Sequence, residues 1–88
     1  MQVYLSGKVM ISRAAAHDHL AERLCLPDYY GRNLDALYDL LMEIDGQTEI
    51  VLEEPASVVE QLGRYGEALL RTLQEAAEEN PNLIITLS

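Results

Sequence analysis

The apolar residues of this chain occur either in short continuous runs or at intervals of three and four positions. Short runs bounded by turn residues predict strands, and the longer spacing predicts amphipathic helices. We expect strands at 2–6, 50–52 and 83–87. We expect helices at 12–24, 33–43, 55–62 and 66–79. The predicted order is therefore strand, helix, helix, strand, helix, helix, strand.

Turn and capping residues mark the ends of these elements. Ser12 and Asn33 stand where the first two helices begin, and both side chains suit an N-cap. Pro55 suits the first position of the third helix, which Gly63 ends. The Asn-Pro-Asn segment 80–82 ends the fourth helix. These signals support the element boundaries independently of the apolar pattern.

The connections between the strands predict the fold. Apolar strands joined by helical crossovers normally run parallel, and the crossovers have a right-handed sense. We therefore expect an α/β fold, a three-stranded parallel sheet packed by four helices in β-α-α-β-α-α-β order. The 88 residues suffice for one hydrophobic core, so we expect a single domain over 1–88. The final strand is almost entirely apolar and is expected to be buried.

The second predicted helix carries three acids spaced four residues apart. At about 100° per residue, Asp35, Asp39 and Glu43 lie on one side of it. The apolar residues gather on the opposite side: Leu34, Leu37, Leu40, Leu41 and Ile44. Like charges four positions apart repel and cost a helix roughly 0.2–0.5 kcal/mol per pair. Folding alone gives no reason for this repulsive arrangement, whereas binding of a cationic partner does.

The charge of the whole chain indicates the same kind of partner. Fifteen Asp and Glu face six Lys and Arg, which gives a formal net charge of -9. Between positions 28 and 60, nine acids accompany a single cation, Arg32. A field of this sign repels phosphate backbones. We therefore expect no direct binding of nucleic acid, and a cationic protein as the partner.

Other features narrow the class of protein. Cys25 is alone, which excludes an internal disulfide, and we expect it to be a small buried apolar residue. His17 and His19 point to different sides of a helix, so we expect solvated imidazoles, no metal site and no cofactor. No apolar run approaches a membrane span and no signal-peptide pattern begins the chain, so we expect a cytoplasmic protein without membrane contact.

One longer motif is much more specific than these patterns. The run LPDYYGRNLDALYDL at 26–40 is followed by an IVLE strand, an amphipathic helix carrying Glu75, and the closing LIITLS. With these features the chain resembles, from end to end, the barstar family of bacterial intracellular inhibitors of secreted barnase-type ribonucleases. The resemblance implies the same fold, no catalytic activity, and inhibition by plugging the ribonuclease active site. Because the high negative charge disfavours self-association, we expect a monomer that forms a 1:1 complex.

The resemblance also implies a partner-binding site. The motif places in it Tyr29, Gly31, Asn33, Leu34, Asp35, Tyr38 and Asp39, and the last helix adds Thr72 and Glu75. Tyr38 stands where barstar has Trp, and Thr72 replaces an apolar contact. The chain departs from the family pattern at Arg32, which adds a cation to the motif, and again at 42–46. These departures bear on the identity of the ribonuclease more than on the mode of binding.

The two central acids have a functional and a structural interpretation. Microbial ribonucleases hold RNA phosphates with Arg, Lys and His, so Asp35 and Asp39 can replace the phosphates in charge-assisted hydrogen bonds. The charge pattern alone fits a solvated helix face as well. A small hydrolase that used the pair as acid and base would lack any supporting motif. The alternative function is an acidic adaptor or antitoxin that binds an unrelated basic protein.

Neighbouring residues of the motif have similar alternatives. Tyr29 and Tyr38 suit interface anchors, or half-buried core positions. For Tyr30 we expect a half-buried ring with an exposed hydroxyl. Gly31 either takes a left-handed conformation or lets a partner approach the backbone, and both can hold at once. On sequence evidence, Asn33 is favoured as a helix cap over a recognition residue.

Overall fold

The computed structural model describes residues 1–88 and has the predicted order of strands and helices. The strands are β1 (Gln2–Ser6), β2 (Thr48–Glu53) and β3 (Leu83–Leu87). The helices are α1 (Arg13–Arg23), α2 (Leu34–Met42), α3 (Pro55–Leu62) and α4 (Arg64–Glu79), and a short 3-10 turn, η1 (Gly7–Val9), follows β1. The main differences from the sequence prediction are a longer β2 and an earlier start of α4.

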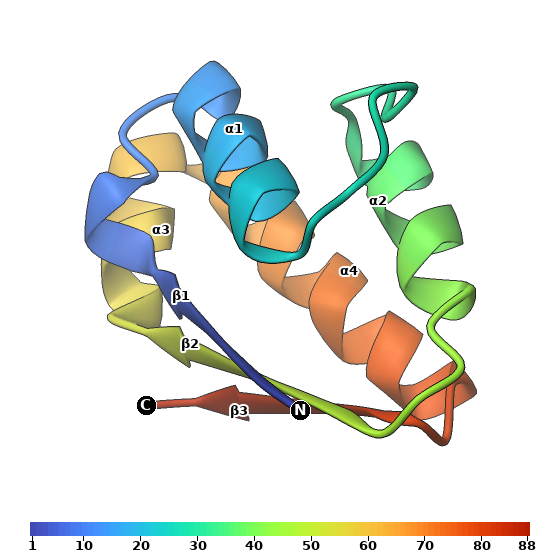
Figure 1. Cartoon of the computed structure of the whole chain (residues 1–88). Coiled ribbons are helices and arrows are strands. Elements are labelled where there is room, and N and C mark those ends of the chain that lie inside the picture. Colours follow the sequence, from blue (N-terminus) through green and yellow to red (C-terminus); the bar gives the residue numbers. More distant parts are fainter.

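The three strands form a parallel sheet in the order β1-β2-β3, which confirms the predicted fold class. Each strand pairs with its neighbour in sequence, as Val3 does with Ile50 and Ile50 with Ile85. Right-handed crossovers that proceed in one direction across a sheet place every connection on the same side. Accordingly, the helices lie together on one side of the sheet (Figure 1).

The opposite side of the sheet is open to solvent, so the expectation of a buried final strand is only partly right. Leu83 is buried, but Ile84, which points to the opposite face, is 54% exposed. Successive side chains of a strand point to opposite faces, and only one face of this sheet is covered by helices. Tyr4 of β1 is exposed as well. An apolar run therefore does not by itself show that both faces are covered.

The core lies between the covered face of the sheet and the helices. Its fully buried members include Leu5, Leu20, Leu37, Leu41, Ile50, Leu52, Val58, Leu69 and Leu73. Within α4, Gly66 lies against α3, where an added Cβ would come within 2.5 Å of the Val58 carbonyl oxygen. This close approach explains why the first turn of α4 contains a glycine.

The predicted starts of α1 and α2 are confirmed by capping hydrogen bonds. The Ser12 Oγ accepts a hydrogen bond from the Ala15 N–H at 3.1 Å, and the Asn33 Oδ1 accepts one from the Ala36 N–H at 2.8 Å. Each bond satisfies an N–H that has no partner within its helix. Pro55 is the first residue of α3, and Gly63, at φ 59°, separates α3 from α4.

The residue after the first helix differs from expectation. Cys25 is exposed and has φ 53°, the left-handed conformation that often ends a helix. The N–H of Leu26 donates to the Ala21 carbonyl oxygen at 2.9 Å, which closes the last turn of α1. The prediction that Cys25 is buried is wrong: its side chain is exposed, although Leu24 and Leu26 on either side pack against the core.

Candidate partner-binding site

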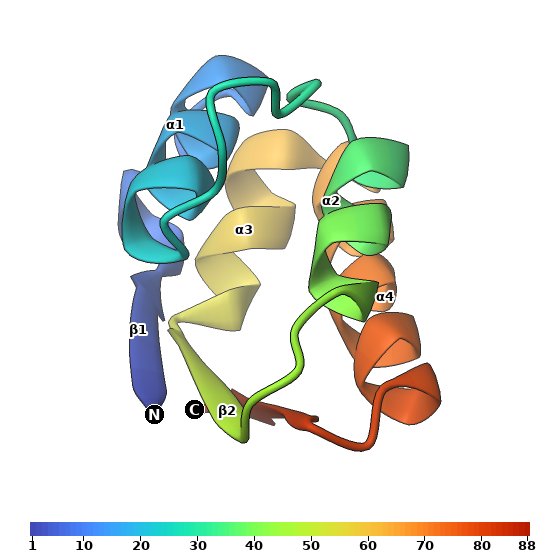
Figure 2. The same ribbon diagram turned by 45° about the vertical axis from the view of Figure 1, so that its right-hand side comes forward.

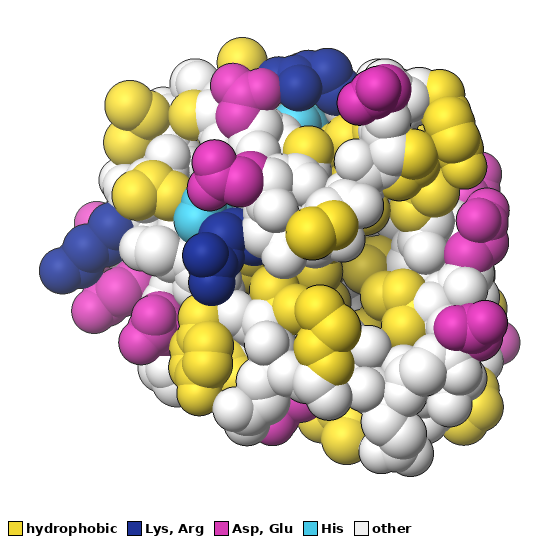
Figure 3. Space-filling model, viewed as in Figure 1, with side chains coloured by type: hydrophobic (Ala, Val, Ile, Leu, Met, Phe, Trp, Pro, Cys, Tyr) yellow, Lys and Arg dark blue, Asp and Glu magenta, His cyan; other side chains and the backbone are white.

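The α2 helix separates its acidic and apolar residues as predicted. Asp35, Asp39 and Glu43 are exposed, whereas Leu37 and Leu41 are fully buried. Acidic side chains lie along the side of the molecule formed by α2 (Figure 3). None of the three carboxylates forms a salt bridge within the chain. They are therefore free to pair with cationic groups of another molecule.

A hollow of about 250 Å³ lies between α2 and the loop before it. Its lining comes from Tyr29, Tyr30, Gly31, Ala36, Asp39, Leu40 and Glu43. Tyr29 is 77% exposed, so it offers a large apolar surface beside the carboxylates. A cationic side chain of a partner could enter this hollow, meet a carboxylate and pack against an aromatic ring. Three residues of the predicted site, Tyr29, Gly31 and Asp39, are thus brought together.

The remaining predicted site residues lie around this hollow or on the next helix. Asp35 lies one turn before Asp39 on α2. Leu34 and Tyr38 are partly buried and pack against the hydrophobic core, so neither is a freely exposed anchor. Thr72 and Glu75 belong to α4, which packs beside α2 (Figure 2).

The side chains of the two α4 residues have different environments. The Thr72 hydroxyl donates to the Ala68 carbonyl oxygen at 2.8 Å within α4, and the Glu75 side chain is exposed. No hydrogen bond or salt bridge joins either residue to α2. Neither residue lines the hollow beside Tyr29, so their membership of the binding site stays a prediction.

The loop before α2 is attached to α1 through a buried histidine. The Tyr30 hydroxyl lies 2.5 Å from His17 Nδ1, and the Tyr65 hydroxyl lies 2.6 Å from His17 Nε2. Burial lowers the pKa of His17, with the nearby Arg32 adding to this effect, so the imidazole is neutral near pH 7. Neutral imidazole offers one donor and one acceptor, and a hydroxyl on each side can match them.

Two sequence predictions are corrected by this network. His17 is buried rather than solvated, and the Tyr30 hydroxyl is hydrogen-bonded in the interior rather than exposed. Burial also raises the pKa of Tyr30 to about 12, so the phenol stays neutral. The sequence carried a signal for His17, because it precedes Leu20 by three residues and Leu24 by seven. That spacing places it on the apolar side of α1.

The second histidine is not solvated either. His19 Nε2 accepts a hydrogen bond from the Ser6 N–H at 3.0 Å, which links α1 to the end of β1. Partial burial lowers the pKa of His19. The two histidines thus point to different surroundings, as predicted, but both serve as structural contacts. No group of three or more His, Cys, Asp or Glu side chains in the molecule is arranged to hold a metal ion.

The cation within the motif is also directed toward α1. The Arg32 guanidinium donates to the carboxylate of Asp18 and, at 3.3 Å, to the Ala14 carbonyl oxygen. It is Arg32, at φ 56°, that takes the left-handed conformation considered for Gly31. An added Cβ at Gly31 would lie 3.1 Å from Asn33 Nδ2, so the loop is tightly folded at that point.

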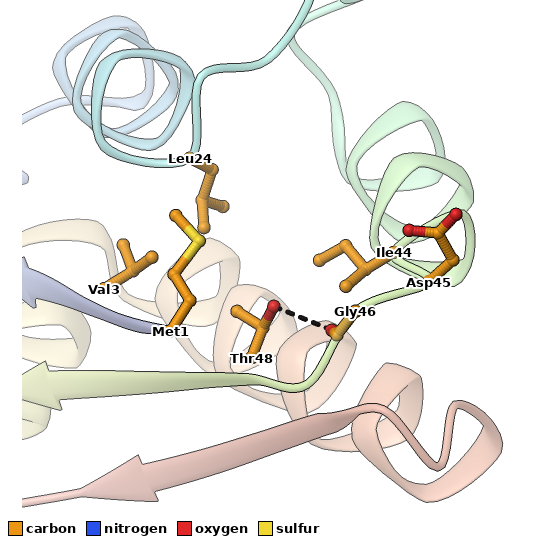
Figure 4. Close-up of a pocket in the computed structure, with 7 residues that line it drawn as sticks. All are labelled: Met1, Val3, Leu24, Ile44, Asp45, Gly46 and Thr48. Atoms are coloured by element: carbon orange, nitrogen blue, oxygen red, sulfur yellow. Dashed lines mark hydrogen bonds between the residues drawn. The ribbon is translucent and has the colours of Figure 1, made fainter.

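A second hollow, of about 340 Å³, opens near the start of the chain. Figure 4 shows Met1, Leu24 and Ile44 pointing into it, whereas the Asp45 carboxylate points away. The Thr48 hydroxyl donates to the Gly46 carbonyl oxygen at 3.0 Å. The lining of this hollow is thus mainly apolar, and the one carboxylate among its residues points away from it. The carboxylates that could bind a cation line the hollow beside Tyr29 instead.

None of the helices is both long enough and apolar enough to cross a membrane. The fold is a parallel sheet with helices on one face, and α2 carries a row of unpaired carboxylates. Both features agree with the resemblance implied by the motif at 26–40. The chain belongs to the barstar family, because the family model described as Barstar (barnase inhibitor) matches residues 1–87.

A curated relative supports the assignment. A protein of Bacillus subtilis (strain 168) named "Putative ribonuclease inhibitor YrdF" is 38% identical to this chain over 79 residues. The match covers 89% of this chain and 87% of that protein. The similarity therefore extends over nearly all of both sequences rather than over a single motif.

Proposed function

We propose that this protein is a cytoplasmic, single-domain inhibitor of a secreted, barnase-type ribonuclease. Membership of the barstar family and the name of the Bacillus subtilis relative support a role in ribonuclease inhibition. The observation that carries the proposal is the row of exposed, unpaired carboxylates at Asp35, Asp39 and Glu43 beside an open hollow. The protein acts by occupying the active site of the enzyme and carries out no reaction itself.

The carboxylates act in place of RNA phosphates. Asp35 and Asp39 are one helical turn apart, about 5–6 Å, so each can pair with a different cationic group of the enzyme. Charge-assisted hydrogen bonds of this kind are roughly twice as strong as neutral ones. Because the acids have no partner in the free protein, binding breaks no internal ion pair. The repulsion along α2 is relieved only when cations arrive.

Aromatic and backbone groups complete the proposed contact surface. Tyr29 packs its exposed ring against the enzyme, and the hollow beside it receives a side chain of the enzyme next to Asp39. Gly31 leaves the loop backbone accessible from outside. The surface further includes Asn33, Leu34, Tyr38, Thr72 and Glu75. Well-packed aromatic residues at the centre of an interface usually contribute more than residues at its edge, so Tyr29 and Asp39 should dominate.

The net charge contributes to the rate of encounter. A protein with a formal net charge of -9 attracts a cationic enzyme over distances set by the Debye length. Attraction of this kind raises the association rate constant and orients the partners before contact. The acidic surface thus favours rapid capture of an enzyme that would otherwise degrade cellular RNA.

Inhibition kinetics test this function. Barnase is titrated with the purified protein while cleavage of a fluorogenic RNA substrate is followed. We expect loss of activity that is complete at one equivalent and competitive with substrate. A pancreatic-type ribonuclease of unrelated fold is the matched control and should stay active. Full activity of barnase and of other barnase-type enzymes with excess protein would refute the proposal, and binding without loss of activity would indicate an adaptor instead.

A further inference from the structure

Arg32 is an unexpected residue for the proposed binding surface. It is the single cation among nine acids between positions 28 and 60, and it lies between Gly31 and Asn33 of the loop that would touch the enzyme. A free guanidinium there would repel the cationic active site of a ribonuclease, because like charges brought together at an interface oppose binding. In the structure, however, this guanidinium is not free.

The guanidinium of Arg32 is held against α1 rather than α2. One nitrogen, Nη2, donates to the Asp18 carboxylate and to the Ala14 carbonyl oxygen. This is the single salt bridge in the molecule, and no carboxylate of α2 takes part in it. The two side chains are 46% and 67% exposed, so the pair contributes little to folding stability. A role beyond stability would explain its position.

Neighbouring residues of α1 hold the loop on both sides of Gly31. His17 contacts the Tyr30 hydroxyl, and the next residue, Asp18, contacts Arg32. The backbone of Arg32 has φ 56°, a conformation that residues with a Cβ adopt only when surrounding contacts impose it. The contacts from α1 therefore fix both the path of the loop and the direction of its cation.

We propose that Asp18 is a positioning residue for ribonuclease binding. By pairing with Arg32, it keeps the guanidinium away from the basic groups of the enzyme and holds the loop in its binding conformation. The inference rests on the proposed function and extends the functional residues to α1, outside the motif at 26–40. The partner it serves is a protein whose binding face is cationic.

A double-mutant cycle on barnase inhibition tests this role. Asp18→Ala should raise the inhibition constant roughly two- to fivefold, the scale on which an exposed ion pair acts. In the Arg32→Gln background, Asp18→Ala should change the inhibition constant no more than the control substitution Glu22→Ala does. Asp18→Glu, which restores a carboxylate, should recover most of the inhibition. A penalty for Asp18→Ala that persists without Arg32 would overturn the proposal.

Glu22→Ala is the matched control, because Glu22 is an exposed acid of the same helix and its removal changes the net charge equally. Urea unfolding should give similar midpoints for the two variants, which separates a binding role from a purely structural one. Equal inhibition constants for Asp18→Ala and Glu22→Ala would also overturn the proposal.

A measurement without ribonuclease separates this inference from the proposed function. The Tyr30 N–H donates to the Pro27 carbonyl oxygen at 2.9 Å within the loop. In Asp18→Ala, hydrogen exchange at Tyr30 should be faster, while exchange at Ala15, near the start of α1, should not change. Unchanged hydrogen exchange at Tyr30 would overturn the claim that Asp18 holds the loop in its conformation. Failure of the unsubstituted protein to inhibit any barnase-type enzyme would instead refute the proposed function.

Discussion

Replacing Asp39 by Ala should change stability and inhibition in opposite directions. Asp39 is exposed, makes no internal ion pair and lies four residues from both Asp35 and Glu43. Its removal relieves two repulsive pairs of roughly 0.2–0.5 kcal/mol each, and Ala is the better helix former. We expect the free energy of unfolding to rise by about 0.5–1.5 kcal/mol.

The same substitution should severely weaken inhibition. At the edge of the hollow, Asp39 would be enclosed in the complex and hydrogen-bonded to cations of the enzyme. Removing one member of such a pair generally costs about 2–5 kcal/mol, and close charge pairs in the barnase and barstar complex, a standard example, couple by about 1.5–7 kcal/mol. That free energy corresponds to an increase in the inhibition constant of about 30-fold to several thousandfold.

Glu60→Ala is the matched control for this prediction. Glu60 is an exposed acid on α3, away from the proposed surface, and its removal changes the net charge by the same amount. Urea unfolding followed by circular dichroism gives the stability, and titration of barnase activity gives the inhibition constant. Equal inhibition constants for the two variants would refute the reasoning, as would a loss of stability in Asp39→Ala large enough to explain weaker inhibition.

Three further outcomes follow from the structure. The association rate constant with barnase should fall steeply as salt is added, because exposed charges are screened over about 8 Å at physiological ionic strength; stopped-flow rates that do not depend on salt would argue against steering. Gly66→Ala forces a Cβ to within 2.5 Å of the Val58 carbonyl oxygen and should cost about 1–3 kcal/mol of stability in a urea titration, whereas Gly46→Ala, with no atom within 4 Å, should be nearly neutral. Burial lowers the pKa of His17 below its ordinary 6.5, so the unfolded chain takes up the proton first as pH falls. The stabilising effect of neutral His17 should therefore be full above about pH 6.5 and decline below it. His17→Gln should reduce the decline in stability that urea unfolding measures between about pH 7.5 and pH 5.5.

The local signals in the sequence predicted most of the fold. The capping residues Ser12 and Asn33 determine where α1 and α2 begin, and their hydrogen bonds are local. The spacing of acids and leucines on α2 likewise predicts which side faces the core. These features depend on neighbours within a few residues, so the order of residues is sufficient to recognise them.

The features that the sequence did not reveal depend on contacts between distant segments. The His17 imidazole bonds to Tyr65, 48 positions away, and Arg32 pairs with Asp18 across the space between the loop and α1. Neither pairing follows from any periodic pattern. The open face of the sheet was missed for a related reason, because the apolar residues of β3 do not show which face the helices will cover.

The structure of a complex with a barnase-type ribonuclease tests the central claim most directly. The account predicts that α2 and the loop before it fill the active-site groove, with Asp35 and Asp39 bonded to the cationic side chains that bind RNA phosphates. A complex in which the groove is empty and this protein contacts the enzyme through the open face of the sheet would contradict it.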